Sequence, residues 1–75
     1  MGRSIHDDDY RKLIDALKAA RMARGLTQQQ VADKLKRPQS YVAKIEGRER
    51  RLDVIEFVHL CRAMEADPAS FFENI

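Results

Sequence analysis

The chain of 75 residues is long enough for one small domain, whose core must be compact and local because so short a chain buries only a modest fraction of its surface. Its composition, 44% apolar and 35% charged, is typical of a soluble helix-rich protein, and no apolar run approaches the length of a membrane span. We therefore expect a cytoplasmic protein that lacks a signal peptide and makes no membrane contact.

Positive charge is concentrated in the middle of the chain. Residues 18–51 hold ten Lys and Arg against three acidic residues, a local charge of +7, whereas residues 1–17 carry −1 and residues 52–75 carry −4. This segregation predicts one surface that binds a polyanion and an acidic surface behind it. The alternative is ordinary solvated charge.

Residues 1–7 lack a helical pattern and are expected to form a flexible tail. Arg3 could remain in this tail or reach into a DNA minor groove. The acidic run that begins at Asp7 matches no metal-ligand spacing, whereas acidic residues at a helix start are favoured by the helix dipole. We interpret the run as charge at the start of a helix and expect no metal site.

The first predicted helix runs from Asp8 or Asp9 to Arg24. Gly25 follows it, at the position where a left-handed residue commonly ends a helix. One face of this helix is apolar and should pack on the core; it consists of Tyr10, Leu13, Ile14, Leu17 and Ala20.

Two short helices, residues 28–36 and 39–46, are predicted next, with a tight turn between them. Thr27 is a suitable N-cap for the first, and Pro38 fits the start of the second because a helix tolerates proline only in its first turn. The side chains that should point inward are Val31, Ala32, Leu35, Val42 and Ile45. The outer side of the second helix carries side chains that can reach base edges or phosphates, namely Gln39, Ser40, Tyr41 and Lys44.

The C-terminal third begins with a polar loop, residues 47–51, whose arginines could meet a sugar-phosphate backbone. Asp53 is the expected N-cap of a helix over residues 53–65, and Pro68 is the expected first residue of a short last helix. The inner face of the longer helix is predicted to hold Val54, Phe57, Val58, Cys61 and Met64. Phe71 should close the core against the first helix, and the single cysteine is expected to be a buried core residue.

The pattern RxxRGLTQxxVAxKL…QSxVxKIE resembles the Cro and phage-repressor type of helix-turn-helix, also called XRE-like. The resemblance extends from about Lys12 to Phe72, nearly the whole chain. It implies an all-α, compact five-helix fold like that of lambda repressor, with the helix-turn-helix at the second and third helices and residues 8–75 forming one domain.

The resemblance also implies a binding surface for double-stranded DNA. Matched residue by residue, the base-reading positions are Gln39, Ser40 and Lys44; by their chemistry, glutamine can pair with adenine and lysine with guanine. The expected phosphate contacts are Thr27, Gln28, Arg37, Tyr41, Arg48, Arg50 and Arg51, with Gln28 also bracing the second motif helix. For Tyr41, contact with a thymine methyl and half-buried packing are the alternatives.

Arg21 and Glu46 match the positions of a structural ion pair in the family, although two independent surface charges are the alternative. The chain departs from the family where glycine is usual, at Lys36, Arg48 and Glu65. A left-handed conformation costs such a residue about 1–2 kcal/mol. Either these positions are strained or the backbone shifts locally. We favour a shift, in which Gly47 adopts the left-handed conformation in place of Arg48.

The predicted function is a sequence-specific transcriptional regulator, most simply a repressor, that reads a palindromic operator as a homodimer through residues 39–46. The homodimer contact is expected at an apolar patch of Leu60, Phe72 and Ile75. The alternative is that Phe72 and Ile75 simply complete the core. The alternative function is a protein-interaction module of the same fold. The sequence shows no catalytic constellation, so no enzyme activity, cofactor or small-molecule ligand is expected.

Overall fold

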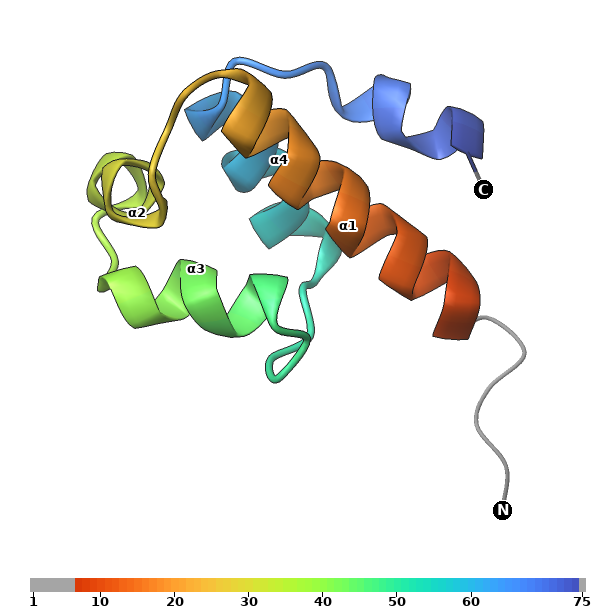
Figure 1. Cartoon of the computed structure of the whole chain (residues 1–75), viewed down its shortest axis with the longest axis horizontal. Coiled ribbons are helices and arrows are strands. Elements are labelled where there is room, and N and C mark those ends of the chain that lie inside the picture. Colours follow the sequence, from red (N-terminus) through yellow and green to blue (C-terminus); the bar gives the residue numbers. More distant parts are fainter. Residues whose placement is uncertain (1–6, 75) are drawn as a thin grey trace.

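The computed structural model describes residues 7–74, which form helices and contain no strand. In chain order the helices are α1 (Asp7–Ala23), α2 (Gln28–Leu35), α3 (Gln39–Glu46), α4 (Val54–Ala63) and the short 3-10 helix η1 (Pro68–Asn74) (Figure 1). The prediction of an all-α five-helix fold is confirmed. None of these helices has the length and apolarity needed to cross a bilayer.

Helix α1 begins at Asp7, so this residue belongs to the helix and not to the predicted tail. Its first turn holds three acidic residues, as the helix dipole favours. The rest of the predicted tail, with Arg3, lies outside the described residues. Gly25 ends the helix with φ +70°, which confirms the predicted left-handed position.

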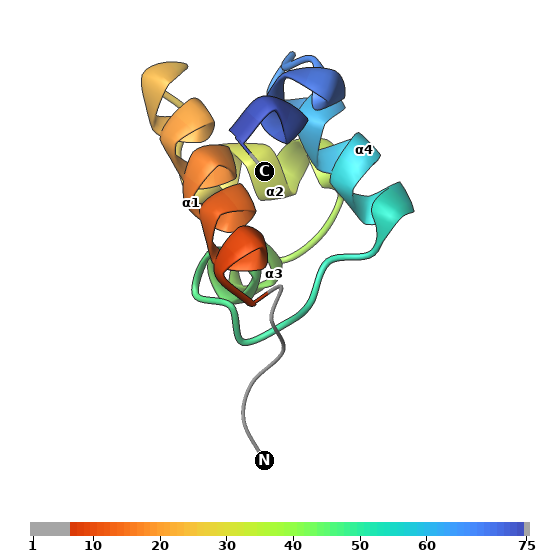
Figure 2. The same cartoon turned by 90° about the vertical axis from the view of Figure 1, so that its right-hand side faces the viewer.

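Helices α2 and α3 form the helix-turn-helix. Thr27 and Gln30 make a capping box at the start of α2, in which the Thr27 hydroxyl accepts from the Gln30 N–H at 3.0 Å and the Gln30 side chain accepts from the Thr27 N–H at 2.8 Å. Pro38 caps α3 with φ −65°. Figure 1 shows α2 end-on and α3 side-on, so the two helices cross at a large angle. In the turned view of Figure 2, α3 again lies at the edge of the molecule.

The helices enclose one apolar core. Its buried members come from every helix: Ile14, Leu17, Val31, Ala32, Val42, Ile45, Phe57, Leu60, Cys61, Ala63, Met64 and Phe71. The prediction that Phe71 closes the core is confirmed, since it is 6% exposed and its ring stands edge-on to Phe57 at 6.0 Å. Burial also raises the pKa of the Cys61 thiol to about 11, as expected for an inert core cysteine.

Two predictions for α4 were wrong. Val54 was expected inside but is 69% exposed, because it lies in the first turn of α4 at the rim of an open hollow that Tyr10, Leu13 and Phe72 also line. Leu60 was expected in a dimer patch but is 4% exposed, because it lies on the same helical stripe as Phe57 and Met64. Leu60 therefore belongs to the core and offers no surface to a second subunit.

Three helix ends carry a left-handed residue other than glycine. Lys36, Arg48 and Glu65 have φ values of 58°, 61° and 56°, whereas Gly47 has φ −82°. The expected shift to Gly47 was therefore wrong, and the strained alternative holds. Each end is closed by a backbone hydrogen bond of the Schellman type, from Arg37 N to Ala32 O (3.0 Å), Glu49 N to Lys44 O (2.9 Å) and Ala66 N to Cys61 O (2.8 Å).

Candidate nucleic-acid interface

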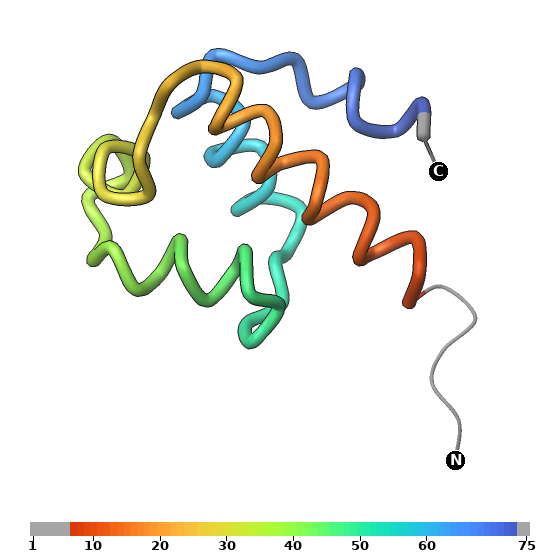
Figure 3. Tube along the Cα trace, viewed as in Figure 1, coloured from red at the N-terminus to blue at the C-terminus, as the bar shows by residue number. Residues whose placement is uncertain are grey.

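Helix α3 presents a polar face to solvent. Val42 and Ile45 are buried, each 1% exposed, and fix the helix against the core. The three predicted base-reading residues, Gln39, Ser40 and Lys44, are all exposed. The trace in Figure 3 shows the loop after α3 projecting beside the same helix before the chain returns to α4. The structure therefore places the expected base-reading and loop positions along one edge of the molecule.

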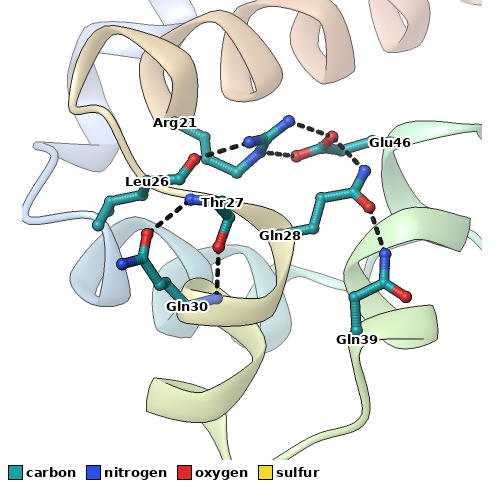
Figure 4. A network of polar contacts seen from close by, with 7 residues as sticks. All are labelled: Arg21, Leu26, Thr27, Gln28, Gln30, Gln39 and Glu46. Atoms are coloured by element: carbon teal, nitrogen blue, oxygen red, sulfur yellow. Dashed lines mark hydrogen bonds and ion pairs between the residues drawn. The ribbon is translucent and has the colours of Figure 1, made fainter.

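A part-buried ion pair joins α1 to the end of α3. Arg21 Nε lies 2.6 Å from Glu46 Oε2, and Arg21 Nη2 lies 3.0 Å from Glu46 Oε1. The side chains are only 11% and 8% exposed. Arg21 also donates from Nη1 to the Leu26 carbonyl at 2.7 Å, so the turn after α1 is held by the same guanidinium (Figure 4). The pairing expected from the resemblance is thus present in the structure, and independent surface charges are excluded.

Two glutamines extend this ion pair to the start of α3. Gln28 Nε2 donates to Glu46 Oε1 at 2.9 Å, and Gln39 Nε2 donates to Gln28 Oε1 at 2.6 Å (Figure 4). Because the Glu46 carboxylate only accepts, Gln28 must turn its NH₂ group toward it and its oxygen toward Gln39. We call these four residues, Arg21, Glu46, Gln28 and Gln39, the amide network.

The amide network decides what Gln39 offers to a ligand. One N–H of Gln39 is used by Gln28, and no other group in residues 7–74 bonds its carbonyl oxygen or its second N–H, so both are available to a ligand. An acceptor beside a donor is the pattern that pairs with N6 and N7 of adenine in the major groove. The brace that the resemblance assigned to Gln28 therefore also sets the direction of the Gln39 amide.

A second cluster lies on the loop side of α3. The guanidinium carbons of Arg37 and Arg50 lie 5.0 and 4.8 Å from the centre of the Tyr41 ring, and Arg50 forms a two-bond ion pair with Glu56. We call Arg37, Tyr41, Arg50 and Glu56 the arginine–tyrosine cluster. Tyr41 is half-buried in it, so its aromatic ring serves packing as well as the surface.

Charge and burial shift the pKa values in this cluster. The hydrogen bonds from Arg50, and then from the Asp53 backbone, lower the pKa of Glu56 to about 2. Burial, followed by the charge of Glu56, raises the pKa of the Tyr41 hydroxyl. Hydrogen bonding to Glu56 raises the pKa of Arg50 above its usual value. Glu56 is therefore ionised under all ordinary conditions.

Sequence reasoning missed Glu56. The residue completes a capping box with Asp53, so the pattern Asp-x-x-Glu was a readable signal for its helix-capping role. Its pairing with Arg50 depends on the path of the loop between α3 and α4, which no local pattern specifies.

The remaining predicted phosphate contacts have different surroundings. Arg48 is exposed. The guanidinium carbon of Arg51 lies 4.1 Å from the centre of the Tyr10 ring on α1. Thr27 has its hydroxyl engaged in the α2 capping box.

Of the predicted dimer patch, Phe72 is 53% exposed and its ring centre lies 5.6 Å from that of Phe57. Ile75 lies outside the described residues.

The chain resembles known regulators along most of its length. A model of the helix-turn-helix domain family matches residues 12–71. An XRE-family like protein from Pseudomonas syringae pv. tomato is 48% identical, with a TM-score of 0.89 over 93% of this chain and 85% of that chain. No curated protein sequence matches.

Two restriction-modification controller proteins of solved structure are also similar. C.AhdI from Aeromonas hydrophila is 28% identical, with a TM-score of 0.77 over 87% of this chain and 98% of that chain. Wild-type C.Esp1396I is 25% identical, with a TM-score of 0.80 over 96% of this chain and 90% of that chain. With its exposed recognition helix and basic flanks, the chain belongs to the helix-turn-helix domain family and is an XRE-like DNA-binding transcriptional regulator.

Proposed function

We propose that the protein is a sequence-specific repressor that binds double-stranded DNA as a homodimer, with α3 in the major groove of each half of a palindromic operator. The observation that carries this proposal is the amide network, because it holds Gln39 at the exposed start of α3 with one donor and one acceptor free. A side chain held in this way can discriminate an adenine by about 1–3 kcal/mol. Ser40 and Lys44 are the other proposed base contacts.

Phosphate contacts on both sides of α3 would fix its register on the duplex. The free backbone N–H groups at the start of α2 favour an anion, and Thr27 and Gln28 lie there. Arg37 before α3 and Arg48 after it supply cations at the groove edges. These contacts carry affinity and make it depend on salt, and base contacts supply the sequence preference.

Repression follows from occupancy. A domain of this size that fills the major groove excludes other proteins from the same base pairs. The restriction-modification controllers among the similar structures support a regulatory role for the fold.

A dimer is proposed because one recognition helix reads only a few base pairs, and two copies on half-sites about one helical turn apart multiply the discrimination. Because Leu60 is buried, the proposed contact moves to exposed apolar side chains at the start of α4 and in η1. Phe72 and Val54, 53% and 69% exposed, line one shallow hollow with Phe57. Phe72→Ser should therefore shift the protein toward monomer in sedimentation, whereas Met22→Ser, a change at an equally exposed apolar residue of α1, should not.

The test of the whole proposal is selection of binding sites from random duplex DNA at two salt concentrations. A palindromic consensus with half-site centres about 10 bp apart is the expected result. Weak binding without a consensus, lost as salt rises, would refute it and leave only an electrostatic surface. The protein-interaction alternative would then be pursued by searching for a partner.

A further inference from the structure

Glu56 holds one arginine of the basic loop in a fixed orientation. Arg50 Nη1 lies 3.0 Å from Glu56 Oε1, and Arg50 Nη2 lies 2.8 Å from Glu56 Oε2. The carboxylate is itself held, because its Oε1 also accepts from the Asp53 N–H at 3.0 Å. The side chain of Glu56 is 19% exposed and that of Arg50 is 39% exposed, so the acid is the more enclosed partner.

The hydrogen bonds of Arg50 leave one edge of its guanidinium free. A guanidinium carries five N–H donors arranged on three sides. Glu56 occupies the side between Nη1 and Nη2, and the Arg51 carbonyl accepts from Nη1 at 3.1 Å. The side formed by Nε and Nη2 has no acceptor in the described part of the chain. Its two parallel N–H groups match two oxygens of a phosphate.

The loop backbone keeps this arginine next to the recognition helix. The N–H groups of Glu49 and Arg50 both donate to the Lys44 carbonyl, at 2.9 and 3.2 Å, which folds the loop back onto the end of α3. Arg50 then lies beside Tyr41, a residue of α3 itself. Backbone, ring and carboxylate together set the direction of the guanidinium.

We propose that Glu56 is a positioning residue for DNA binding: it occupies one edge of Arg50 and so directs the Nε–Nη2 edge toward a phosphate beside the groove that α3 enters. The inference rests on the DNA-binding function proposed above. It gives an acidic residue a favourable role in binding a polyanion, the reverse of what its charge alone predicts.

The test compares two variants that remove one negative charge each. Glu56→Gln keeps the side-chain length and can still cap α4, since glutamine serves at this position of a capping box, but it loses the charge that orients Arg50. Glu49→Gln makes the same charge change within the basic loop, at a carboxylate that does not pair with Arg50 in the described part of the chain. Binding to one operator duplex is measured by fluorescence anisotropy at several salt concentrations.

We expect Glu56→Gln to bind about fivefold more weakly than wild type and to reduce the slope of log K against log salt by about 0.9, the value of one phosphate contact. Glu49→Gln should bind as tightly as wild type or more tightly. Arg50→Ala should match Glu56→Gln, and the double variant should lose little more, because both changes remove the same contact.

Unchanged or tighter binding by Glu56→Gln, in step with Glu49→Gln, would overturn the proposal. A lost preference at one base pair with an unchanged salt slope would overturn the phosphate assignment in favour of a guanine edge. If Glu56→Gln unfolds, Arg50→Lys replaces it in the test, because it leaves the α4 cap intact. Lysine retains the positive charge but lacks the two parallel N–H groups of the Nε–Nη2 edge, so Arg50→Lys should also bind DNA more weakly than wild type. If the wild-type protein shows no sequence preference, the proposed function is refuted instead. The slopes of log K against log salt for wild type and Glu56→Gln on the same duplex would still decide the role of Glu56.

Discussion

Two polar clusters flank the recognition helix, and they differ in how far water reaches them. In the amide network, the side chains of Arg21 and Glu46 are 11% and 8% exposed. In the arginine–tyrosine cluster, those of Arg50 and Glu56 are 39% and 19% exposed. Both contain an arginine–carboxylate pair with two short bonds, so the chemistry of the pair is the same and its surroundings are not.

The difference teaches what each cluster can contribute. An enclosed pair keeps its side chains in one orientation, because little water competes for its hydrogen bonds and a broken bond leaves a charge without its partner. A more exposed pair contributes little stability but keeps cations available to a polyanion. We therefore propose that the amide network governs the choice of base, and that the arginine–tyrosine cluster governs affinity and its salt dependence.

The largest expected effect comes from breaking the enclosed pair. Glu46→Ala leaves Arg21 without its carboxylate and removes the partner of Gln28, so the free energy of unfolding should fall by about 3 kcal/mol. Asp15→Ala, which removes the exposed partner of Arg11 at 3.9 Å, should cost less than about 0.5 kcal/mol. Urea denaturation of both variants measures the contrast between the enclosed pair and an ordinary surface pair, and equal small losses would contradict the structural role given to the amide network.

Left-handed residues beside both clusters should give effects of intermediate size. Gly25 has φ +70° with nothing within 4 Å of an added Cβ, so Gly25→Ala should cost about 1 kcal/mol through backbone strain alone. Lys36→Gly and Arg48→Gly should conversely gain about 0.5–1 kcal/mol, because they relieve the same strain. Thermal unfolding checks the signs, and a loss of stability in both glycine variants would show that these turns are not strained.

Arg48→Gly also tests whether the arginine–tyrosine side of α3 contributes to DNA affinity. Arg48→Gly should weaken DNA binding while it stabilises the fold, if the loop keeps a strained cation for its phosphate contact. Anisotropy titration beside the unfolding measurement tests this trade-off, and unweakened binding would remove Arg48 from the proposed contacts.

The smallest effect is a pH dependence at Glu56. Its pKa is lowered from 4.5 to about 2 in the folded protein, chiefly by the hydrogen bonds from Arg50. A lowered folded pKa gives stability that is present above pH 4.5 and is lost as the pH falls toward 2. The stability advantage of wild type over Glu56→Gln should therefore shrink across this range. Denaturation midpoints at a series of pH values measure it, and a constant difference would exclude the ion pair as its source.

Local sequence signals predicted most of the fold. Thr27, Pro38 and Asp53 mark helix starts through their caps, and Gly25 marks a helix end, so the element boundaries fell within one or two residues. These signals work because capping is decided by neighbouring residues. The family resemblance then supplied the pairing of Arg21 with Glu46, residues too distant in sequence for any local rule.

Most of the errors share a different cause, because they depended on tertiary position. Helical periodicity placed Val54 on the inner face of α4, but it could not tell that nothing in the described part of the fold covers this side chain, which is 69% exposed. The preference for glycine favoured a shift to Gly47, whereas the helix geometry and its closing hydrogen bonds impose the left-handed residue at Arg48. The ion pair between Glu56 and Arg50 required knowledge of how the loop after α3 folds back. Leu60 is the exception, because its place on the stripe of Phe57 and Met64 could have been predicted from helical periodicity.

The most direct test of the account is selection of DNA sites by wild type, Gln28→Met and Gln29→Met. Gln28→Met removes the amide that orients Gln39, whereas Gln29→Met changes a neighbour whose side chain donates to Asp33 on the same helix. We predict that Gln28→Met loses the preference at the base pair read by Gln39, with the rest of the consensus retained, and that Gln29→Met selects the wild-type consensus. An undiminished preference at that base pair in Gln28→Met would contradict the claim that the amide network sets what the recognition helix reads.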